Sequence, residues 1–265
     1  MKLKRKSAKS TVSRRMAILA HLEKNGQVNV NALSESLGVS SVTIRNDLEQ
    51  LEKKNMLLRA RGGAMKFTQP YVGLDYPLSD KQKKHLLEKQ EIGKRAAGLI
   101  EEGNTIILDS GSTTFELAKN LSKFENLTVI TNAINIANYL SKHKNINVIV
   151  PGGILRRNSV SLVGMLAEKG FKNYFCDLLF IGVDGFDISH GISTPNNEEA
   201  QLNQIMIEIS RRVIVVADSS KFQRRAFAFI AGIEKIHAII TDSGVSEENK
   251  NKLESMGIEV IIVAA

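Results

Sequence analysis

The sequence predicts an α/β protein in two parts, an N-terminal winged helix-turn-helix domain followed by a C-terminal domain built on a mostly parallel sheet. Three observations support this. Residues 1–69 hold 14 Lys and Arg against 5 Asp and Glu, whereas residues 70–265 hold 22 against 23. Within the basic part, a short glycine turn separates two helical segments. Beyond it, strand-like runs rich in Val, Ile and Leu alternate with helical runs.

The overall composition excludes several protein classes. The 265 residues are 43% hydrophobic and 24% charged, with a net charge of +8, as expected of a globular chain. A single cysteine, Cys176, and scattered histidines give no disulfide framework and no metal-ligand spacing, so we expect no metal and no cofactor. Because no apolar run approaches the ~18–20 residues of a membrane span and no signal peptide is recognisable, we expect a cytoplasmic protein without membrane contact.

The asymmetric charge favours a nucleic-acid-binding head over residues 1–69 on a near-neutral body over residues 70–265. A solvated basic tail would give the same excess of charge, so the motifs must decide. We expect a first helix over Ser13–Asn25, a β-prone stretch over 27–30, and a second helix capped by Asn31 and ended by Gly38. A third helix, capped by Ser40 or Ser41, runs to about residue 54 and completes a helix-turn-helix.

The third helix has one apolar stripe, Ile44, Leu48 and Leu51, which we expect to face the core. The opposite side carries polar residues suited to reading a major groove, since Asn bonds adenine and Arg bonds guanine. Hydroxyls at the helix start are suited to phosphate. An ordinary amphipathic helix with a solvated outer face is the alternative. Together with two arginines that follow this helix, these positions give the candidate DNA-contacting residues: Ser40, Ser41, Val42, Thr43, Arg45, Asn46, Lys53, Arg59 and Arg61.

A small β-wing is predicted after the third helix. An apolar strand over 56–58, a basic Gly-Gly turn over 59–64 and a return strand over 65–67 would place Arg59 and Arg61 along phosphates or in a minor groove. A simple hairpin that closes the domain is the alternative.

A connector follows the wing. Residues 66–80 contain Pro70, Pro77 and Gly73 and read as extended chain. We therefore expect the helix-turn-helix domain over residues 1–66, the linker over 67–80 and the second domain over 81–265. One long helix is expected from Ser79 to Ile100.

The second domain is expected to contain a parallel sheet covered on both faces. The predicted strands are 105–108, 128–131, 147–150, 178–183, 212–217, 237–241 and 259–263. The predicted helices include 113–122, 133–141, 197–210 and 246–256.

In such sheets, ligands bind at the carboxyl ends of the strands. The first strand is followed by Asp109-Ser110-Gly111-Ser112-Thr113-Thr114 and then a helix, an arrangement that can cradle a phosphate. It is neither a Walker A loop nor a dinucleotide fingerprint, and a tight turn with a helix cap is the alternative. Later strands end in segments that are each compatible with a plain turn: Thr131-Asn132, Gly152-Gly153, Asp184-Gly185 with Asp187 nearby, and Asp218-Ser219-Ser220-Lys221. Their convergence on one edge favours a cleft for a sugar phosphate.

These motifs resemble the DeoR family of transcriptional regulators over nearly the whole chain. The head carries the resemblance in the run from Val39 to Leu48, in Leu51-Glu52 and in Arg59…Gly62-Gly63-Ala64. The body carries it in 108–114, 131–132, 152–153, 180–185 and 217–221. The family often has Arg where Asn46 stands and His where Arg61 stands. Asn46 and the stretch from Gly191 to Ala200 look closest to the branch that includes N-acetylgalactosamine operon repressors.

The resemblance implies a Rossmann-like sensor domain similar to ribose-5-phosphate isomerase and glucosamine-6-phosphate deaminase. It implies a repressor that binds double-stranded operator DNA as a homodimer or homotetramer and is released by a phosphorylated sugar or amino sugar. The candidate effector-binding residues are Asp109, Ser110, Gly111, Ser112, Thr113, Thr131, Asn132, Gly152, Gly153, Asp184, Glu198 and Lys221. The alternative is a sugar-phosphate isomerase or deaminase with a DNA-binding appendage, in which Asp184, Asp187 and Glu198 would be the acid–base groups.

Overall fold

The computed structural model describes residues 11–25, 27–53, 57–60, 62–65, 71–72 and 75–264. The chain divides into two compact units, Met1–Pro70 and Tyr71–Ala265. Among the described residues, no helix combines the length and the apolar character that a membrane crossing requires.

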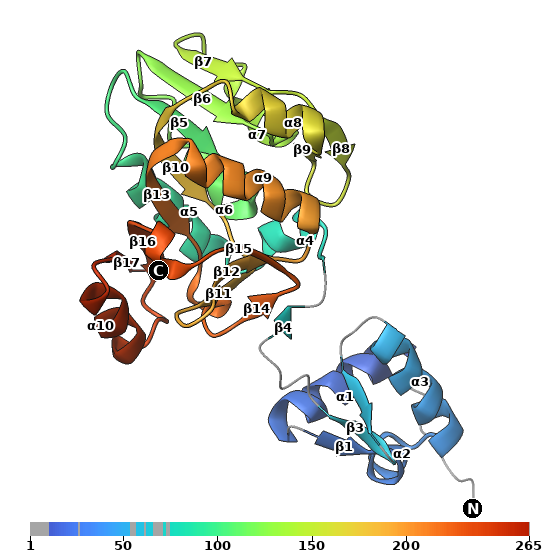
Figure 1. The fold of residues 1–265 in the computed structure, drawn as a ribbon. Helices are drawn as coiled ribbons and strands as arrows, with labels where there is room; N and C mark the ends of the chain where they lie inside the picture. The colour runs from blue at the N-terminus through green and yellow to red at the C-terminus, as the bar shows by residue number, and fades with distance from the viewer. Residues whose placement is uncertain are drawn as a thin grey trace, which may run out of the picture. The chain divides into compact units, whose positions relative to one another are not determined.

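The N-terminal unit is a winged helix-turn-helix (Figure 1). Its helices are α1 (Thr11–Asn25), α2 (Val30–Leu37) and α3 (Ser41–Lys53), and its strands are β1 (Gln27–Asn29), β2 (Leu58–Ala60) and β3 (Gly63–Met65). The strands form an antiparallel sheet in the order β1-β3-β2. β2 and β3 make a wing at the predicted place, but both strands extend into the segment 59–64 that was predicted as a turn. Residues 56, 66 and 67 of the predicted wing strands lie outside the described residues.

Side-chain caps fix the turn between α2 and α3. Asn29, and not the predicted Asn31, caps α2: its side chain accepts the backbone N–H of Asn31 at 2.8 Å, because the helix begins two residues earlier than expected. Gly38 ends α2 in the left-handed conformation (φ 67°), as predicted. The Ser40 hydroxyl accepts the N–H of Thr43 at 3.1 Å and so caps α3.

The core of this unit confirms the predicted stripe. Ile44, Leu48 and Leu51 are buried, and α1 contributes Ile18 and Leu22 to the same cluster. Asp47 is also buried, and its carboxylate accepts hydrogen bonds from Arg14 and from Arg15, the latter at 2.8 Å. This double ion pair fastens α3 to α1.

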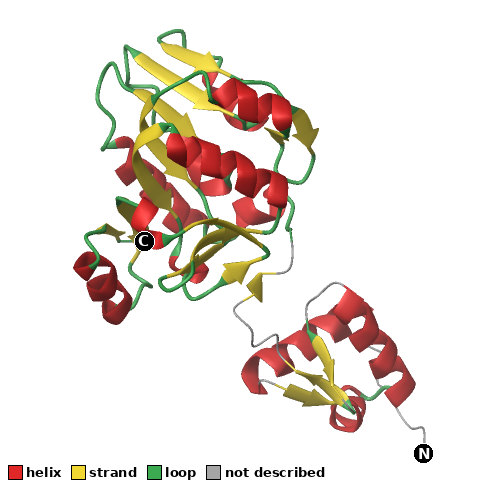
Figure 2. Ribbon diagram, in the orientation of Figure 1, coloured by secondary structure: helices red, strands yellow, loops and turns green. Residues whose placement is uncertain are grey.

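The C-terminal unit is built on one seven-stranded sheet in which all six pairings are parallel (Figures 1 and 2). Its order is β17-β16-β13-β10-β5-β6-β7. The strands are β5 (Thr105–Leu108), β6 (Leu127–Thr131), β7 (Ile146–Ile149), β10 (Cys176–Ile181), β13 (Ser210–Val216), β16 (Ala238–Asp242) and β17 (Glu259–Val263). Each of the seven predicted strands is present.

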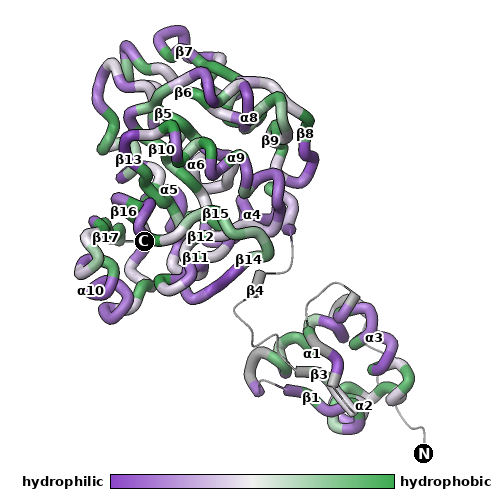
Figure 3. Tube along the Cα trace, in the orientation of Figure 1, coloured by the Kyte–Doolittle hydropathy of each residue, from purple (hydrophilic) through white to green (hydrophobic). Residues whose placement is uncertain are grey.

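Helices cover both faces of the sheet, and the strands between them are apolar (Figure 3). One core cluster contains residues of α5 (Leu86–Ala97), α6 (Ser112–Ala118) and α7 (Ile134–Leu140). The other contains residues of α8 (Met165–Phe171), α9 (Asn197–Glu208) and α10 (Glu247–Ser255). Gly93 lets α5 approach α6 closely, because a Cβ there would lie 2.6 Å from backbone atoms of residues 116 and 117.

Several shorter strands surround this sheet and were not predicted. β11 (Gly185–Asp187), β12 (Gly191–Thr194) and β15 (Ala228–Ala231) form a three-stranded sheet. β8 (Ile154–Arg156) pairs with β9 (Ser161–Val163) in a hairpin.

The segment after residue 70 differs from the predicted linker and helix. β4 (Tyr71–Val72) pairs with β14 (Arg225–Ala226), so residues that the sequence assigned to the linker pack on the C-terminal unit. The predicted single helix over 79–100 is two helices, α4 (Leu78–Lys83) and α5, separated by Lys84 and His85. The break lies at His85, which adopts a left-handed backbone (φ 52°).

We predict that Asp47→Ala destabilises the N-terminal unit by about 3 kcal/mol, because it leaves two arginines without their shared buried partner. Burial alone would raise the pKa of Asp47, but the hydrogen bonds from Arg14 and Arg15 outweigh it and hold this pKa below its usual value. The stabilisation is therefore complete above about pH 4 and is lost as the pH falls through the folded-state pKa. Native-state amide exchange of α3 measures this free energy of unfolding. The exposed Gln50→Ala on the same helix is the control, and an equal loss in both variants would contradict the prediction.

Candidate functional site

A cavity lies at the carboxyl edge of three adjacent central strands, β5, β10 and β13. From β5 the chain builds the sheet outward through β6 and β7, then returns to β10 and builds in the other direction. The cavity therefore lies at the point where the strand order reverses, which is where parallel α/β sheets bind ligands. Its volume is about 50 Å³. The lining includes Tyr76, Leu78, Lys81, Lys89, Asp109, Ser110, Gly111, Ser112, Thr113, Asn158, Ser159, Asp184, Thr194, Glu199, Asn203 and Lys221.

The loop from β5 to α6 forms one wall. Ser110, Ser112 and Thr113 bring hydroxyls to the cavity, and the extended Gly111 precedes α6. Asp109 is only 3% exposed, and its carboxylate accepts backbone N–H groups of Ser110 and Gly182. The Asn203 amide, with its nitrogen turned toward acceptors, donates to Asp109 Oδ1 at 3.3 Å. Burial, reinforced by the nearby Glu199, raises the pKa of Asp109 to about 8.

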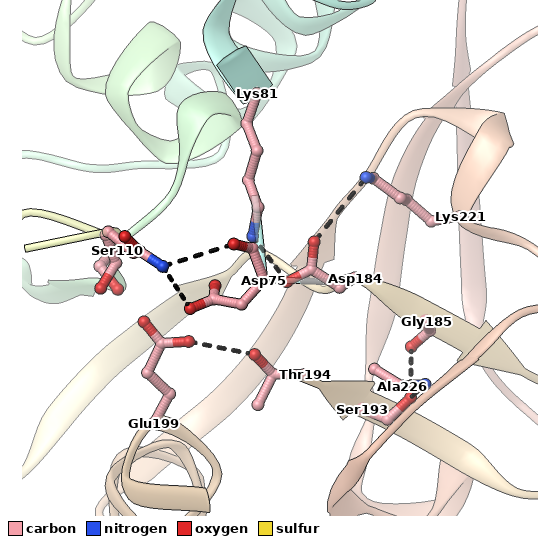
Figure 4. A network of polar contacts seen from close by, with 12 residues as sticks. Asp75, Lys81, Ser110, Asp184, Gly185, Ser193, Thr194, Glu199, Lys221 and Ala226 are labelled. Atoms are coloured by element: carbon pink, nitrogen blue, oxygen red, sulfur yellow. Dashed lines mark hydrogen bonds and ion pairs between the residues drawn. The ribbon is translucent and has the colours of Figure 1, made fainter. Parts of the chain in front are cut away.

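Three lysines surround the cavity. Lys81 Nζ donates to Asp184 Oδ2 at 2.8 Å, and Lys221 Nζ lies 4.0 Å from Asp184 Oδ1 (Figure 4). Burial disfavours the charge of Lys81, but Asp184 outweighs it and raises the pKa of Lys81. Lys89 is 3% exposed, and its Nζ donates to the backbone carbonyls of residues 81 and 84. Burial lowers the pKa of Lys89 to about 8.

A second ion-pair group borders the same cavity. Arg156 donates to Glu199 Oε1 at 2.8 Å and also to the Asp75 carboxylate. Thr194 donates to Glu199 Oε2 at 3.2 Å (Figure 4). This group connects α9 and β12 to residue 75, just before α4.

A larger basic cavity of about 230 Å³ adjoins the first and shares Tyr76, Lys81, Lys89, Asp184 and Lys221 with it. It adds Lys84, His85, Asp218, Ser220 and Arg224. Cations outnumber carboxylates in this lining, so the combined site favours anions.

The structure brings together most, but not all, of the residues expected to bind an effector. Residues 109–113, Asp184 and Lys221 line the first cavity, whereas Thr131, Asn132, Gly152, Gly153 and Glu198 are not part of its lining. Thr131 is buried and bonds the Leu108 carbonyl at 2.7 Å, and the Asn132 amide bonds the Leu162 carbonyl at 3.2 Å, so both are engaged in the fold.

Two of the remaining expected residues serve the backbone between β7 and β8. Gly152 and Gly153 follow β7 with positive φ angles, and a Cβ on Gly153 would lie 2.8 Å from the Val163 carbonyl. Glu198 is exposed, and its neighbour Glu199 faces the cavity instead. Four cavity residues were not predicted, because they lie on helices and carry no local motif: Lys81, Lys89, Glu199 and Asn203.

The candidate DNA-contacting residues lie mostly on the outer face of α3. Val42 is 59% exposed, and Ser40, Arg45 and Asn46 are exposed, whereas Ser41 and Thr43 are half-buried. Arg59 of the wing donates through Nη1 to the Arg45 carbonyl at 3.2 Å, so it ties the wing to α3. The side chain of Lys53 and all of Arg61 lie outside the described structure.

Comparison with known proteins decides the family. A family model described as the DeoR-like helix-turn-helix domain matches residues 14–69, and one described as the DeoR C terminal sensor domain matches residues 84–243. The chain belongs to the DeoR family. The family assignment confirms the resemblance carried by the sequence motifs, and the DeoR sensor match spans the strands β5, β10 and β13 that frame the cavity.

Relatives match this DeoR-family chain over almost its full length. A putative aga operon transcriptional repressor of Escherichia coli O157:H7 is 41% identical, over 97% of this chain and 96% of that protein. The transcriptional regulator GlpR of Haloferax volcanii is 36% identical, over 88% and 90%. GolR of Listeria innocua is 34% identical, over 94% and 97%. Ribose 5-phosphate isomerase A of Methanocaldococcus jannaschii, at 17% identity, 51% and 53% coverage and a TM-score of 0.37, is too distant to bear on activity.

We predict that anion binding in the DeoR sensor cavity weakens as the pH rises through about 8. Lys89 loses its positive charge and Asp109 gains a negative one over the same interval, and both changes oppose an anion. Calorimetric titration with sulfate between about pH 6.5 and pH 9 measures the effect, since the charge of sulfate is constant there.

Asp109→Asn is the matched variant for this experiment, because the amide reproduces the neutral form of the acid. It should flatten the pH dependence without abolishing it. An affinity that stays constant across this interval in the unmodified protein would show that neither group senses the bound anion.

Proposed function

We propose that this DeoR-family regulator represses an operon for the use of a sugar or amino sugar, and that a phosphorylated form of that sugar releases it from DNA. One observation carries the proposal. Three lysines, Lys81, Lys89 and Lys221, meet buried carboxylates and hydroxyls at the point where the sheet order reverses. A phosphorylated sugar has complementary chemistry, with an anionic group at one end and hydroxyl or amine donors elsewhere.

Each part of such a ligand has partners in the cavity. The lysines and the hydroxyl loop 110–113 offer positive charge and donors to the phosphate. Glu199 and Asn203 offer acceptors to hydroxyls, and the Glu199 carboxylate suits the ammonium group of an amino sugar. Asp109, whose pKa of about 8 keeps it neutral at pH 7, offers a donor as well as an acceptor. The relative named as an aga operon repressor supports an amino-sugar pathway.

The DNA-binding role supports a symmetric assembly. Helix-turn-helix regulators place two recognition helices on half-sites one helical turn apart. We therefore propose a homodimer or homotetramer, acting in the cytoplasm, in which effector binding disfavours the DNA-binding arrangement of the two heads.

The acid–base groups of the enzymatic alternative are poorly placed for catalysis. Glu198 is exposed outside the cavity, and Asp184 is paired with Lys81. Burial alone would raise the pKa of Asp187, but hydrogen bonds from Arg225, His190 and the Ser189 N–H bring this pKa to about 2, far from that of an effective general base at neutral pH. These features favour sensing over turnover.

We predict that Arg45→Ala and Asn46→Ala each weaken binding to the upstream DNA of the protein's own operon by about 5- to 150-fold, equivalent to ~1–3 kcal/mol for a lost base contact. Binding to random DNA should change little. Fluorescence anisotropy at several salt concentrations measures both affinities. The exposed Lys252→Ala on α10 of the C-terminal unit is the control, and equal losses on random DNA would reassign both residues to phosphate contact.

We predict that one of a panel of phosphorylated sugars releases the protein from that DNA. The panel is galactosamine 6-phosphate, N-acetylgalactosamine 6-phosphate, glucosamine 6-phosphate, tagatose 6-phosphate and tagatose 1,6-bisphosphate. Lys221→Gln should raise the concentration needed for half-release about tenfold, because it removes one charge-assisted contact to phosphate. The exposed Lys252→Gln on α10 carries the same charge change and should respond as the unmodified protein does. A response equally weakened in both variants would remove Lys221 from the site.

A further inference from the structure

Residues 75–81 form a strap across the effector cavity. Tyr76, Leu78 and Lys81 of this segment line the cavity directly. The strap follows β4 in the C-terminal unit, and the N-terminal unit ends at residue 70. The strap is therefore both a wall of the sensing site and a part of the sensor unit close in sequence to the DNA-binding unit.

Polar contacts hold the strap closed. Asp75 accepts hydrogen bonds from Arg156 and, at 2.8 Å, from the Asn158 amide. The Leu78 N–H donates to the Asn158 carbonyl at 2.7 Å. Lys81 pairs with Asp184 at 2.8 Å (Figure 4). Asp75 is 26% exposed and can exchange these partners for water, whereas the opposite walls are strand ends and helices anchored in the core.

The closed strap leaves little room for a ligand beside the loop 109–113. The cavity there encloses about 50 Å³ and the adjoining basic cavity about 230 Å³, whereas sites for small organic ligands enclose ~300–1,000 Å³. The cation that the strap brings is also occupied, because Lys81 is paired with Asp184. An incoming anion gains this lysine only when that pair opens.

We propose that the effector binds by displacing the strap. The ligand's phosphate takes Lys81 from Asp184, and the Asp75–Arg156 contact opens as the cavity enlarges. The closed strap is then the DNA-binding state, and the open strap is the effector-bound state of lower DNA affinity. This inference rests on the proposed function for the identity of the ligand, and it adds Lys81 and Tyr76 as effector-contacting residues supplied by a moving segment.

Weakening the closed strap should change the apparent affinity for the effector in one direction only. If the closed strap must open before the ligand binds, the apparent affinity for the ligand is reduced by the small fraction of open molecules. A substitution that weakens the closed strap raises that fraction. It should therefore tighten effector binding in proportion to that rise, an unusual result for a loss of contacts, whereas DNA affinity falls only slightly because closed molecules remain the majority.

Asp75→Asn tests this combination in the full-length protein. The amide is close to the carboxylate in shape but removes the charge that pairs with Arg156, which keeps Glu199 as a partner. We expect faster amide exchange over 75–83, about fivefold tighter binding of the releasing sugar phosphate, and release from DNA at a ligand concentration about fivefold lower, whereas DNA affinity without ligand should fall by less than about twofold because most molecules remain closed. Asp80→Asn, an exposed strap residue with the same charge change, is the matched control and should change none of these.

The outcomes separate the two proposals. Unchanged exchange and unchanged affinities in Asp75→Asn would overturn the strap mechanism, and weaker effector binding would show that the strap closes on the ligand instead. If no compound of the panel binds either protein, the proposed effector class is wrong. In that case, amide exchange over 75–83 still decides whether the Asp75 contacts hold the strap closed.

Discussion

The compensation of buried charge at the carboxyl edge of β5, β10 and β13 is the constraint on which the sensor unit depends. A charged group taken from water is tolerated only with a partner or with hydrogen bonds. Lys89 donates hydrogen bonds to the carbonyls of residues 81 and 84. Asp184 accepts from Lys81, and Glu199 accepts from Arg156. Several of these partners come from elements outside the sheet, so the same contacts that make the edge polar also hold the strap and the β8–β9 hairpin in place.

The location of this charge follows from the topology. A parallel sheet directs the carboxyl ends of its strands to one edge, and the reversal between β5 and β10 leaves that edge uncovered by a crossing connection. Each strand then delivers whatever residue follows it: Asp109 after β5, and Asp184 shortly after β10. The apolar strands are needed to bury the sheet, and the polar chemistry is confined to the residues just beyond them.

This division explains what the sequence could predict. The seven strands and the loop 109–113 were predictable because hydrophobic runs and the residues after them are local signals. Lys81 and Lys89 were not, because a lysine on a helix has the same local pattern whether it faces water or a cavity. The choice between Glu198 and Glu199 depends on helix phase. Asn196 caps α9 by accepting the N–H of Glu199, and this cap turns Glu199 inward and Glu198 outward.

The break between α4 and α5 connects the buried charge of Lys89 to the backbone of the strap. A continuous helix would use the carbonyls of residues 81 and 84 in its own backbone ladder. The left-handed His85 interrupts the ladder, and the freed carbonyls accept the Lys89 ammonium. Lys89 therefore contacts both the backbone carbonyl of Lys81, the strap's last residue, and the cavity. An anion beside Lys89 competes with those carbonyls for its protons, so ligand charge and strap conformation act on the same side chain.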